Sequence, residues 1–169
     1  MAPAAAPVRA AWDEWTDRWS ADPNAVYTGD GLLGAADRLR ASFAALIGAD
    51  PATIAITDNT CRAANIAIRI LAERPGGNVV VDDGTYPSSD YPWHARGDRE
   101  VRHVPTDGVA DAAGALAERI DADTVAVCIT HVAPFTGRRH DLRAIADAAH
   151  ARGAKLVVDA AQSTGVVPI

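Results

Sequence analysis

Hydrophobic and polar positions along this chain follow two different periods, and each period predicts a different element. Between Leu32 and Leu46 apolar residues recur every three or four positions, which predicts an amphipathic helix that ends at Gly48. The same period between residues 141 and 152 predicts another helix, with Gly153 as its stop. Short runs rich in β-branched residues lie between such stretches and predict strands.

The predicted strands and helices alternate along the chain. Alternation at this spacing is typical of a mostly parallel sheet with helices on both faces, so the predicted fold class is α/β. Ligands of such sheets bind beyond the carboxyl ends of the strands. The predicted strands span residues 54–57, 79–82, 101–105, 125–131 and 156–159, and further helices are predicted over residues 60–73, 88–96 and 111–120.

The first part of the chain is rich in tryptophan. A helix is predicted over residues 8–19, with Trp12, Trp15 and Trp19 on one face. Such a stripe is more often a packing face than a ligand cage, and it suggests docking onto a partner or a second domain. We therefore predict a docking segment over residues 1–25 and a main domain over residues 26–169.

The composition argues against several classes of protein. The formal net charge is −6 and no basic stripe is present, which argues against nucleic acid or an anionic membrane as a partner. No long apolar stretch and no signal peptide are visible, so a cytoplasmic location is expected. Cys61 and Cys128 are too few and too far apart for a redox pair or a zinc cluster. We therefore predict no metal site, and we expect both cysteines to be reduced and near the core.

Polar residues follow the first two predicted strands. Asn59 and Thr60 come after the run at residues 54–57 and open a predicted helix, where free N–H groups favour an anion. Taken alone, this pair is more typical of an ordinary helix cap. Tyr86 follows the run at residues 79–82, and it is either a residue that stacks on a ligand ring or a surface tyrosine in a polar turn.

The last two predicted strands also end in polar residues. His131 ends the run at residues 125–131, and it contacts substrate, orients its loop or serves as a structural histidine. Asp159 ends the last run, and Gln162 follows it in the order Val-Val-Asp-Ala-Ala-Gln-Ser-Thr-Gly. A lone aspartate after a strand is common, whereas this ordered pair is much more specific.

Taken together, these segments resemble the cofactor-binding part of class V aminotransferase-like enzymes, which include cysteine desulfurases, cysteine lyases and isopenicillin N epimerase-like proteins. The resemblance implies pyridoxal phosphate (PLP) as the cofactor and a partial large domain of a PLP fold type I enzyme. It implies that Asp159 pairs with the pyridine nitrogen and that His131 belongs to the catalytic site. The remaining cofactor contacts that it implies are Asn59 and Thr60 at the phosphate, Tyr86 on the ring face and Gln162 at the ring hydroxyl.

The chain departs from the family pattern at three places. Asp58 stands where the family often has a small residue, and Pro134 stands where it often has an asparagine near the ring hydroxyl. In the family the lysine that forms the Schiff base follows on a later strand, and Lys155 is the only lysine of this sequence. On an extended strand Lys155 and Asp159 are ~13 Å apart at ~3.3 Å per residue. Lys155 is therefore predicted to be a solvated lysine at a strand entrance.

These features support three hypotheses. The leading one is a split PLP-dependent enzyme acting on an amino acid, as a C–S lyase, desulfurase or epimerase, with the lysine supplied by a complementary C-terminal-half subunit. This chain is then inactive alone and forms a heterodimer or heterotetramer with that subunit. The second is a non-catalytic pseudoenzyme, or an assembly or regulatory partner of a full-length PLP enzyme. The third is an unrelated nucleotide-binding domain, although the sequence contains no GxGxxG or Walker A pattern.

Overall fold

The computed structural model describes residues 4–27, 31–71, 73 and 75–168. Contacts within the chain divide it into two compact units, Met1–Ile56 and Thr57–Ile169. This division falls later than the predicted boundary after residue 25, and the docking role of residues 1–25 stays a prediction. No helix in the described part of the chain is long and apolar enough to cross a membrane.

The first unit is helical. Its helices are α1 (Ala6–Ala21), η1 (Pro23–Tyr27), α2 (Leu32–Ile47) and η2 (Pro51–Thr53). The predicted stop of α2 is confirmed, because Gly48 has a left-handed φ of 69° and donates its N–H to the Ala44 carbonyl. α1 buries none of its residues, and Trp12 and Trp19 are 70% and 58% exposed. Trp12 and Trp19 of the tryptophan stripe are therefore exposed within this unit, whereas Trp15 is half-buried.

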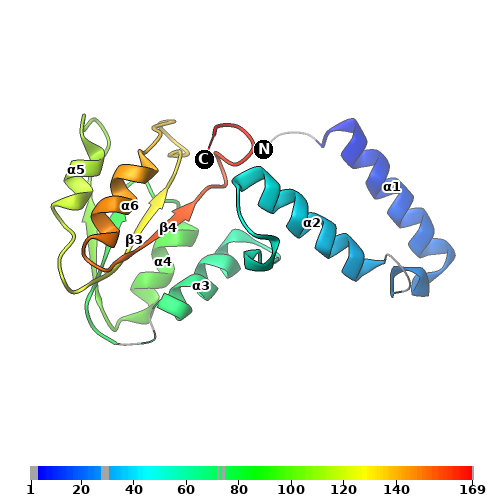
Figure 1. The fold of residues 1–169 in the computed structure, drawn as a ribbon, viewed down its shortest axis with the longest axis horizontal. Helices are drawn as coiled ribbons and strands as arrows, with labels where there is room; N and C mark the ends of the chain where they lie inside the picture. The colour runs from blue at the N-terminus through cyan, green and yellow to red at the C-terminus, as the bar shows by residue number, and fades with distance from the viewer. Residues whose placement is uncertain (1–3, 28–30, 72, 74, 169) are drawn as a thin grey trace. The chain divides into compact units, whose positions relative to one another are not determined.

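The second unit contains a parallel sheet, as the alternating pattern predicts (Figure 1). The strands lie in the order β2-β1-β3-β4, and each neighbouring pair is parallel. The elements of this unit are α3 (Thr60–Leu71), β1 (Asn78–Asp82), α4 (Pro87–Arg96), β2 (Glu100–Val104), α5 (Ala112–Ala117), β3 (Thr124–Thr130), α6 (Leu142–His150) and β4 (Lys155–Asp159).

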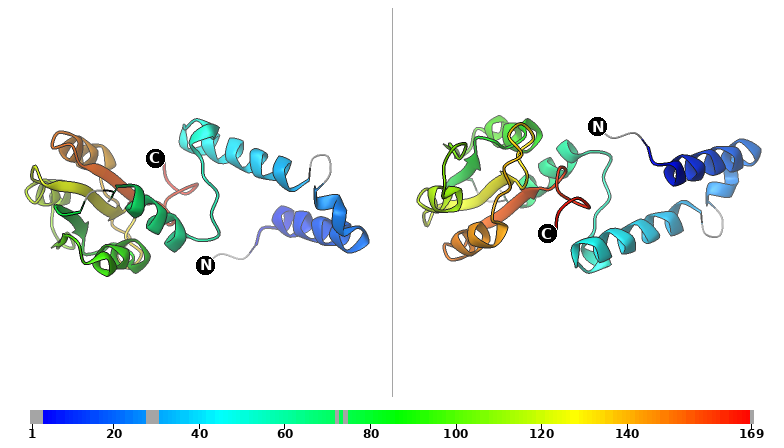
Figure 2. Two further views of the ribbon diagram at one scale, coloured as in Figure 1. Left: turned by 90° about the horizontal axis from the view of Figure 1, so that it is seen from below. Right: turned by 90° about the horizontal axis from the view of Figure 1, so that it is seen from above.

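Helices cover both faces of the sheet. Successive residues of the central strands point to opposite sides, so both faces present apolar side chains for helices to bury. Val80 packs with residues of α5 and α6 on one face. Val79 and Val81 pack with Ile68 of α3 and Trp93 of α4 on the other. Figure 2 shows α4 and α6 on opposite sides of the sheet. The predicted α/β architecture is thus confirmed.

The chain changes direction across the sheet at β1. β1 lies between β2 and β3, and it continues into α4 on one face, whereas β3 continues toward α6 on the other. In open α/β sheets such a reversal leaves a crevice outside the carboxyl ends of the two strands, where ligands bind. These ends carry Asp82 and Thr130, and the adjacent end of β4 carries Asp159.

Two predictions from the sequence are wrong. The apolar run at residues 54–57 forms no strand, and in the described part of the chain the sheet consists of β1 to β4. Alternating apolar residues favour an extended backbone, but a strand also requires a neighbouring strand with which to pair. Cys61 was expected near the core and is instead exposed, whereas Cys128 is buried as expected.

Candidate functional site

The carboxylate of Asp159 is held at the carboxyl end of β4. The residue is 8% exposed, and its Oδ2 accepts a hydrogen bond from the Ser89 hydroxyl at 3.1 Å. Its Oδ1 accepts a second bond from the Ala161 N–H at 3.0 Å, which is the local pattern of a strand-end turn. A carboxylate offers about four lone-pair positions, so Asp159 keeps the capacity to accept a further N–H.

Thr130 connects Tyr86 to the strand that carries Asp159. Thr130 pairs in register with Asp159, and its Oγ1 accepts a hydrogen bond from the Tyr86 N–H at 2.9 Å. This bond fixes the backbone of Tyr86, while the residue stays 47% exposed. An aromatic ring with a fixed backbone and an open side chain suits stacking on a planar ligand, as the resemblance implies. Its stacking role stays a prediction.

His131 opens a hairpin that brings it beside His140. The His131 N–H donates to the Asp159 carbonyl at 2.9 Å, and the His131 carbonyl accepts from the His140 N–H at 3.0 Å. Burial, followed by the charges of Arg139 and His140, lowers the pKa of His131 below its usual value. Its Nδ1 is buried and has no hydrogen-bond partner among the described residues. The ring therefore presents a neutral, unused nitrogen near the end of β4.

A buried polar network lies at the end of the central strand β1. The carboxylate of Asp82 accepts a short hydrogen bond of 2.5 Å from the Thr106 hydroxyl, and its Oδ2 lies 3.2 Å from His140 Nε2. Burial by itself raises the pKa of Asp82, but the bonds from His140 and Thr106 outweigh it and hold this pKa below its usual value. The network therefore anchors the hairpin that carries His131.

The predicted phosphate residues lie at the N-terminus of α3. Asn59 Oδ1 accepts a hydrogen bond from the Arg62 N–H at 2.8 Å, so Asn59 is a helix cap. A cap does not exclude an anion, because the first N–H groups of a helix, including that of Thr60, have no partner within it. Asp58 lies 3.5 Å from the Arg62 guanidinium, which offsets its carboxylate charge beside this position. The phosphate contact itself stays a prediction.

The last two residues considered in the sequence, Gln162 and Lys155, lie at opposite ends of the stretch that contains Asp159. Gln162 is exposed in the turn that follows Asp159, so its side chain is free to reach a ligand. Lys155 is the first residue of β4 and is exposed, at the opposite end of the strand from Asp159. The predicted position of Lys155 as a strand-entrance lysine is confirmed, and it lies away from the other candidate residues.

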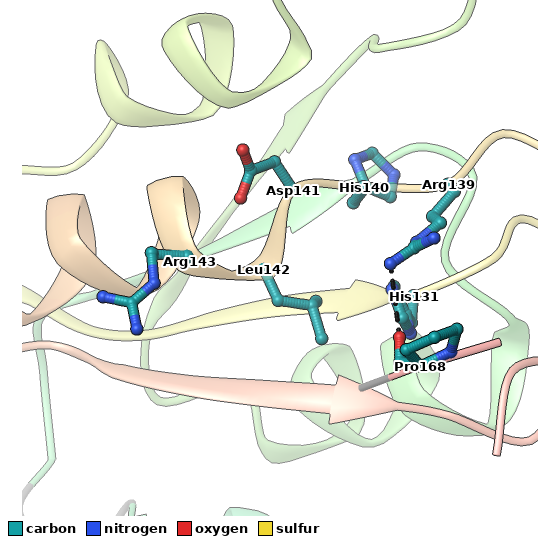
Figure 3. Close-up of a pocket in the computed structure, with 7 residues that line it drawn as sticks. All are labelled: His131, Arg139, His140, Asp141, Leu142, Arg143 and Pro168. Carbon is teal, nitrogen blue, oxygen red and sulfur yellow. Dashed lines mark hydrogen bonds between the residues drawn. The ribbon is translucent and has the colours of Figure 1, made fainter.

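A cavity of about 480 Å³ has His131 in its lining. Figure 3 shows Arg139 bonded to the Pro168 carbonyl across it, at 3.2 Å. The lining includes His131 and His140 but neither Tyr86 nor Asp159. Its residues are His131, Arg139, His140, Asp141, Leu142, Arg143 and Pro168. Hydrogen bonds, rather than this cavity, therefore define the candidate site around Asp159.

Sequence reasoning missed three residues that organise this site. Ser89, Thr130 and His140 contact Asp159, Tyr86 and Asp82 across gaps of tens of residues. Thr130 lies within the strand predicted over residues 125–131, Ser89 at the start of the helix predicted over residues 88–96, and His140 just before the helix predicted over residues 141–152. Their hydrogen-bond partners could not be predicted from the sequence, because these contacts depend on the order of the strands in the sheet.

The sequence profile of one family, "Aminotransferase class-V", matches residues 2–169. The chain belongs to this family. Among curated relatives, it is 37% identical over 130 residues to a probable cysteine desulfurase of Methanothermobacter thermautotrophicus, covering 75% of this chain and 32% of the relative. It is 34% identical over 131 residues to the uncharacterized aminotransferase YcbU of Bacillus subtilis, covering 77% of this chain and 35% of that protein. It is 32% identical over 139 residues to the kynureninase of Pseudomonas fluorescens, covering 79% of this chain and 33% of that protein.

The chain thus spans about a third of the length of these relatives. Solved structures agree with the class V assignment. A mutant of C-DES with glycine covalently linked to the PLP cofactor superposes with a TM-score of 0.72 at 27% identity, covering 79% of this chain and 37% of that one. The cysteine desulfurase CsdA of Escherichia coli gives a TM-score of 0.69 at 25% identity, covering 78% of this chain and 35% of that one. The predictions of a class V member, of PLP fold type I and of PLP as the family's cofactor are confirmed.

Three features of the described residues fit PLP. Asp159 presents a buried carboxylate with acceptor capacity left, which suits a pyridine N–H. His131 Nδ1 is a buried polar atom without a partner, as expected beside a polar ligand. The α3 N-terminus offers backbone N–H groups to a phosphate.

Proposed function

We propose that this chain forms the pyridine and phosphate side of the PLP site in a class V enzyme that acts on an amino acid. The observation that carries the proposal is the Asp159 carboxylate, buried at the end of β4 and bonded to Ser89 of α4. A carboxylate held by hydrogen bonds from Ser89 and Ala161 is suited to hold a proton on a pyridine nitrogen without reorganising. PLP supplies an electron sink for bonds broken at the substrate's α-carbon.

The neighbouring residues have distinct tasks in this proposal. Tyr86 stacks on the face of the ring and fixes its plane, and Gln162 donates to the ring hydroxyl. Asn59 and Thr60 bind the phosphate at the start of α3, where the helix dipole favours negative charge. His131, neutral because of its lowered pKa, accepts or donates one hydrogen bond and orients substrate or loop.

The reacting lysine comes from polypeptide outside these residues. Lys155 is the only lysine in the sequence, and it lies at the wrong end of β4. We infer that a complementary subunit supplies this lysine, together with the groups that select among C–S cleavage, desulfuration and epimerisation. The exposed Trp12 and Trp19 are the surface that we assign to this assembly.

The position of Lys155 at the wrong end of β4 also supports a second candidate function. A chain that binds PLP without a reacting lysine is also suited to be a non-catalytic partner of a full-length relative. The two candidates differ in where the lysine resides. The complementary polypeptide of a split enzyme becomes covalently labelled by PLP and borohydride only in the complex, whereas a full-length relative is labelled with or without this chain.

The test is a titration of the chain with PLP, followed by borohydride reduction and peptide mapping. We expect reversible binding by the chain, no label on Lys155, and labelling of the complementary polypeptide when it is added. Thr60→Ala should weaken binding, while Thr136→Ala, at an exposed turn position, should not. A stoichiometric label on Lys155 in the folded chain would contradict the proposal.

A further inference from the structure

A second group of ligating side chains lies on the edge-strand side of α4, outside the site described above. It consists of Asp90 and His94 on α4 and His103 on β2, whose potential ligand atoms lie within 4.8 Å of one another. Asp90 and His94 are four residues apart and so share one face of the helix. His103 lies on the same sheet face as Val101, which packs beside Trp93 of α4.

The three ligand atoms have the separations of a coordination face. His94 Nε2 lies 3.1 Å from His103 Nε2 and 3.2 Å from Asp90 Oδ1, and His103 Nε2 lies 3.5 Å from the same oxygen. Ligands about 2.0–2.1 Å from a tetrahedral zinc ion are about 3.3 Å apart. The three distances bracket this value.

Hydrogen bonding alone leaves this group incomplete. One N–H···N bond accounts for the contact between the two rings, which lie 14° from parallel with their centroids 5.3 Å apart. Asp90 Oδ1 is buried, and although it lies 3.2 Å from His94 Nε2 it takes part in no hydrogen bond among the described residues. A divalent cation satisfies all three atoms. The side chains of His94 and His103 are 48% and 38% exposed, so their rings can rotate to direct both lone pairs at it.

A fourth residue sets the tautomer that a metal needs. Asp83 Oδ1 lies 3.3 Å from His103 Nδ1, so that nitrogen carries the proton and Nε2 keeps its lone pair. A carboxylate behind a histidine is the usual outer partner of a metal-bound imidazole. The side chain of Asp90 itself is only 13% exposed, which favours pairing with a cation over solvation.

We propose that Asp90, His94 and His103 bind a divalent first-row transition metal, with Zn²⁺ as the best match to two imidazoles and one carboxylate. Three protein ligands leave one position for water. The site ties α4 to the edge strand β2, and α4 also carries Ser89, the donor to Asp159. The expected role is therefore structural, and it does not depend on PLP binding.

The test is zinc titration of the untagged full chain after treatment with a chelator, with Co²⁺ absorption as a report on tetrahedral geometry. We expect one equivalent of Zn²⁺ to bind and to raise the unfolding temperature, while Mg²⁺, which prefers oxygen ligands, does not compete. His94→Ala and His103→Ala should each weaken binding more than about 100-fold, and Asp83→Asn about 10-fold. His150→Ala, at an exposed position on α6, is the matched control.

Asp90→Asn supplies an independent check, because it keeps the size of the side chain and removes its charge. It should weaken zinc binding while leaving the circular dichroism of the chain unchanged. The proposal is overturned if the parent chain has no zinc site, or if both histidine variants bind zinc as the parent does. In that case the two histidines form a proton-bridged pair only.

Discussion

Ser89 donates its hydroxyl hydrogen to Asp159 Oδ2 at 3.1 Å, and both residues are buried. This bond joins the first turn of α4 to the end of β4. The backbone carbonyl of Ser89 also accepts a hydrogen bond from the thiol of Cys128 on β3 at 3.3 Å, so Ser89 contacts both strands. The position of the Asp159 carboxylate therefore depends on two elements that are distant in sequence.

Replacing Ser89 with alanine should lower the free energy of unfolding by about 1–3 kcal/mol, since a buried carboxylate loses a hydrogen bond. Ser88→Ala is the matched control, because the Ser88 hydroxyl is buried without a hydrogen-bond partner among the described residues. Urea denaturation of both variants measures the difference. Equal losses for the two serines would show that the Ser89 bond contributes nothing specific.

The lowered pKa of His131 makes stability depend on pH in a defined window. Above its ordinary value of 6.5 the ring is neutral in both the folded and unfolded states, so it has no effect. As the pH falls below that value, the unfolded state takes up the proton first and the free energy of unfolding decreases until the folded pKa is reached. Denaturation between about pH 7 and pH 5 measures this loss.

His131→Asn should flatten that decline, whatever it does to stability at neutral pH. His150→Asn, at an exposed position, should keep it. The lowered pKa of Asp82 also makes stability depend on pH, but in a more acidic range. There the free energy of unfolding decreases as the pH falls below 3.8 toward the folded pKa of Asp82, so its effect is separable from that of His131. An unchanged slope in His131→Asn would show that another group titrates in this window.

The two cysteines should differ sharply in reactivity. Burial raises the pKa of Cys128 to about 12, whereas Cys61 is exposed on α3. Only the thiolate is nucleophilic, so a disulfide reagent should label Cys61 at once and Cys128 only after unfolding. Counting labelled thiols in native and denatured samples tests this, with Cys61→Ser as the control. Two fast thiols in the native chain would contradict the burial of Cys128.

Much of the fold could be predicted from local pattern. The period of α2 and the polar residues after each strand depend on neighbours in sequence, and the structure has them close to where they were expected. Residues 54–57 fail as a strand because pairing is not a local property. The partners of Ser89 and His140 were unpredictable for the same reason. The spacing of Asp90 and His94 is visible in the sequence, but their approach to His103 requires the packing of α4 on β2.

The central claim is that Asp159 holds a proton on the pyridine nitrogen of PLP. Its most direct test is Asp159→Asn in the enzyme assembled with the polypeptide that carries the lysine, with turnover and bound PLP measured on the same sample. Asparagine keeps the shape of the side chain and one acceptor oxygen but loses the charge. Asp147→Asn, on the exposed surface of α6, is the matched control. We predict that Asp159→Asn lowers turnover by about 100-fold or more while most of the cofactor stays bound. Near-normal turnover at full occupancy would contradict the account and make Asp159 a structural residue of the strand end.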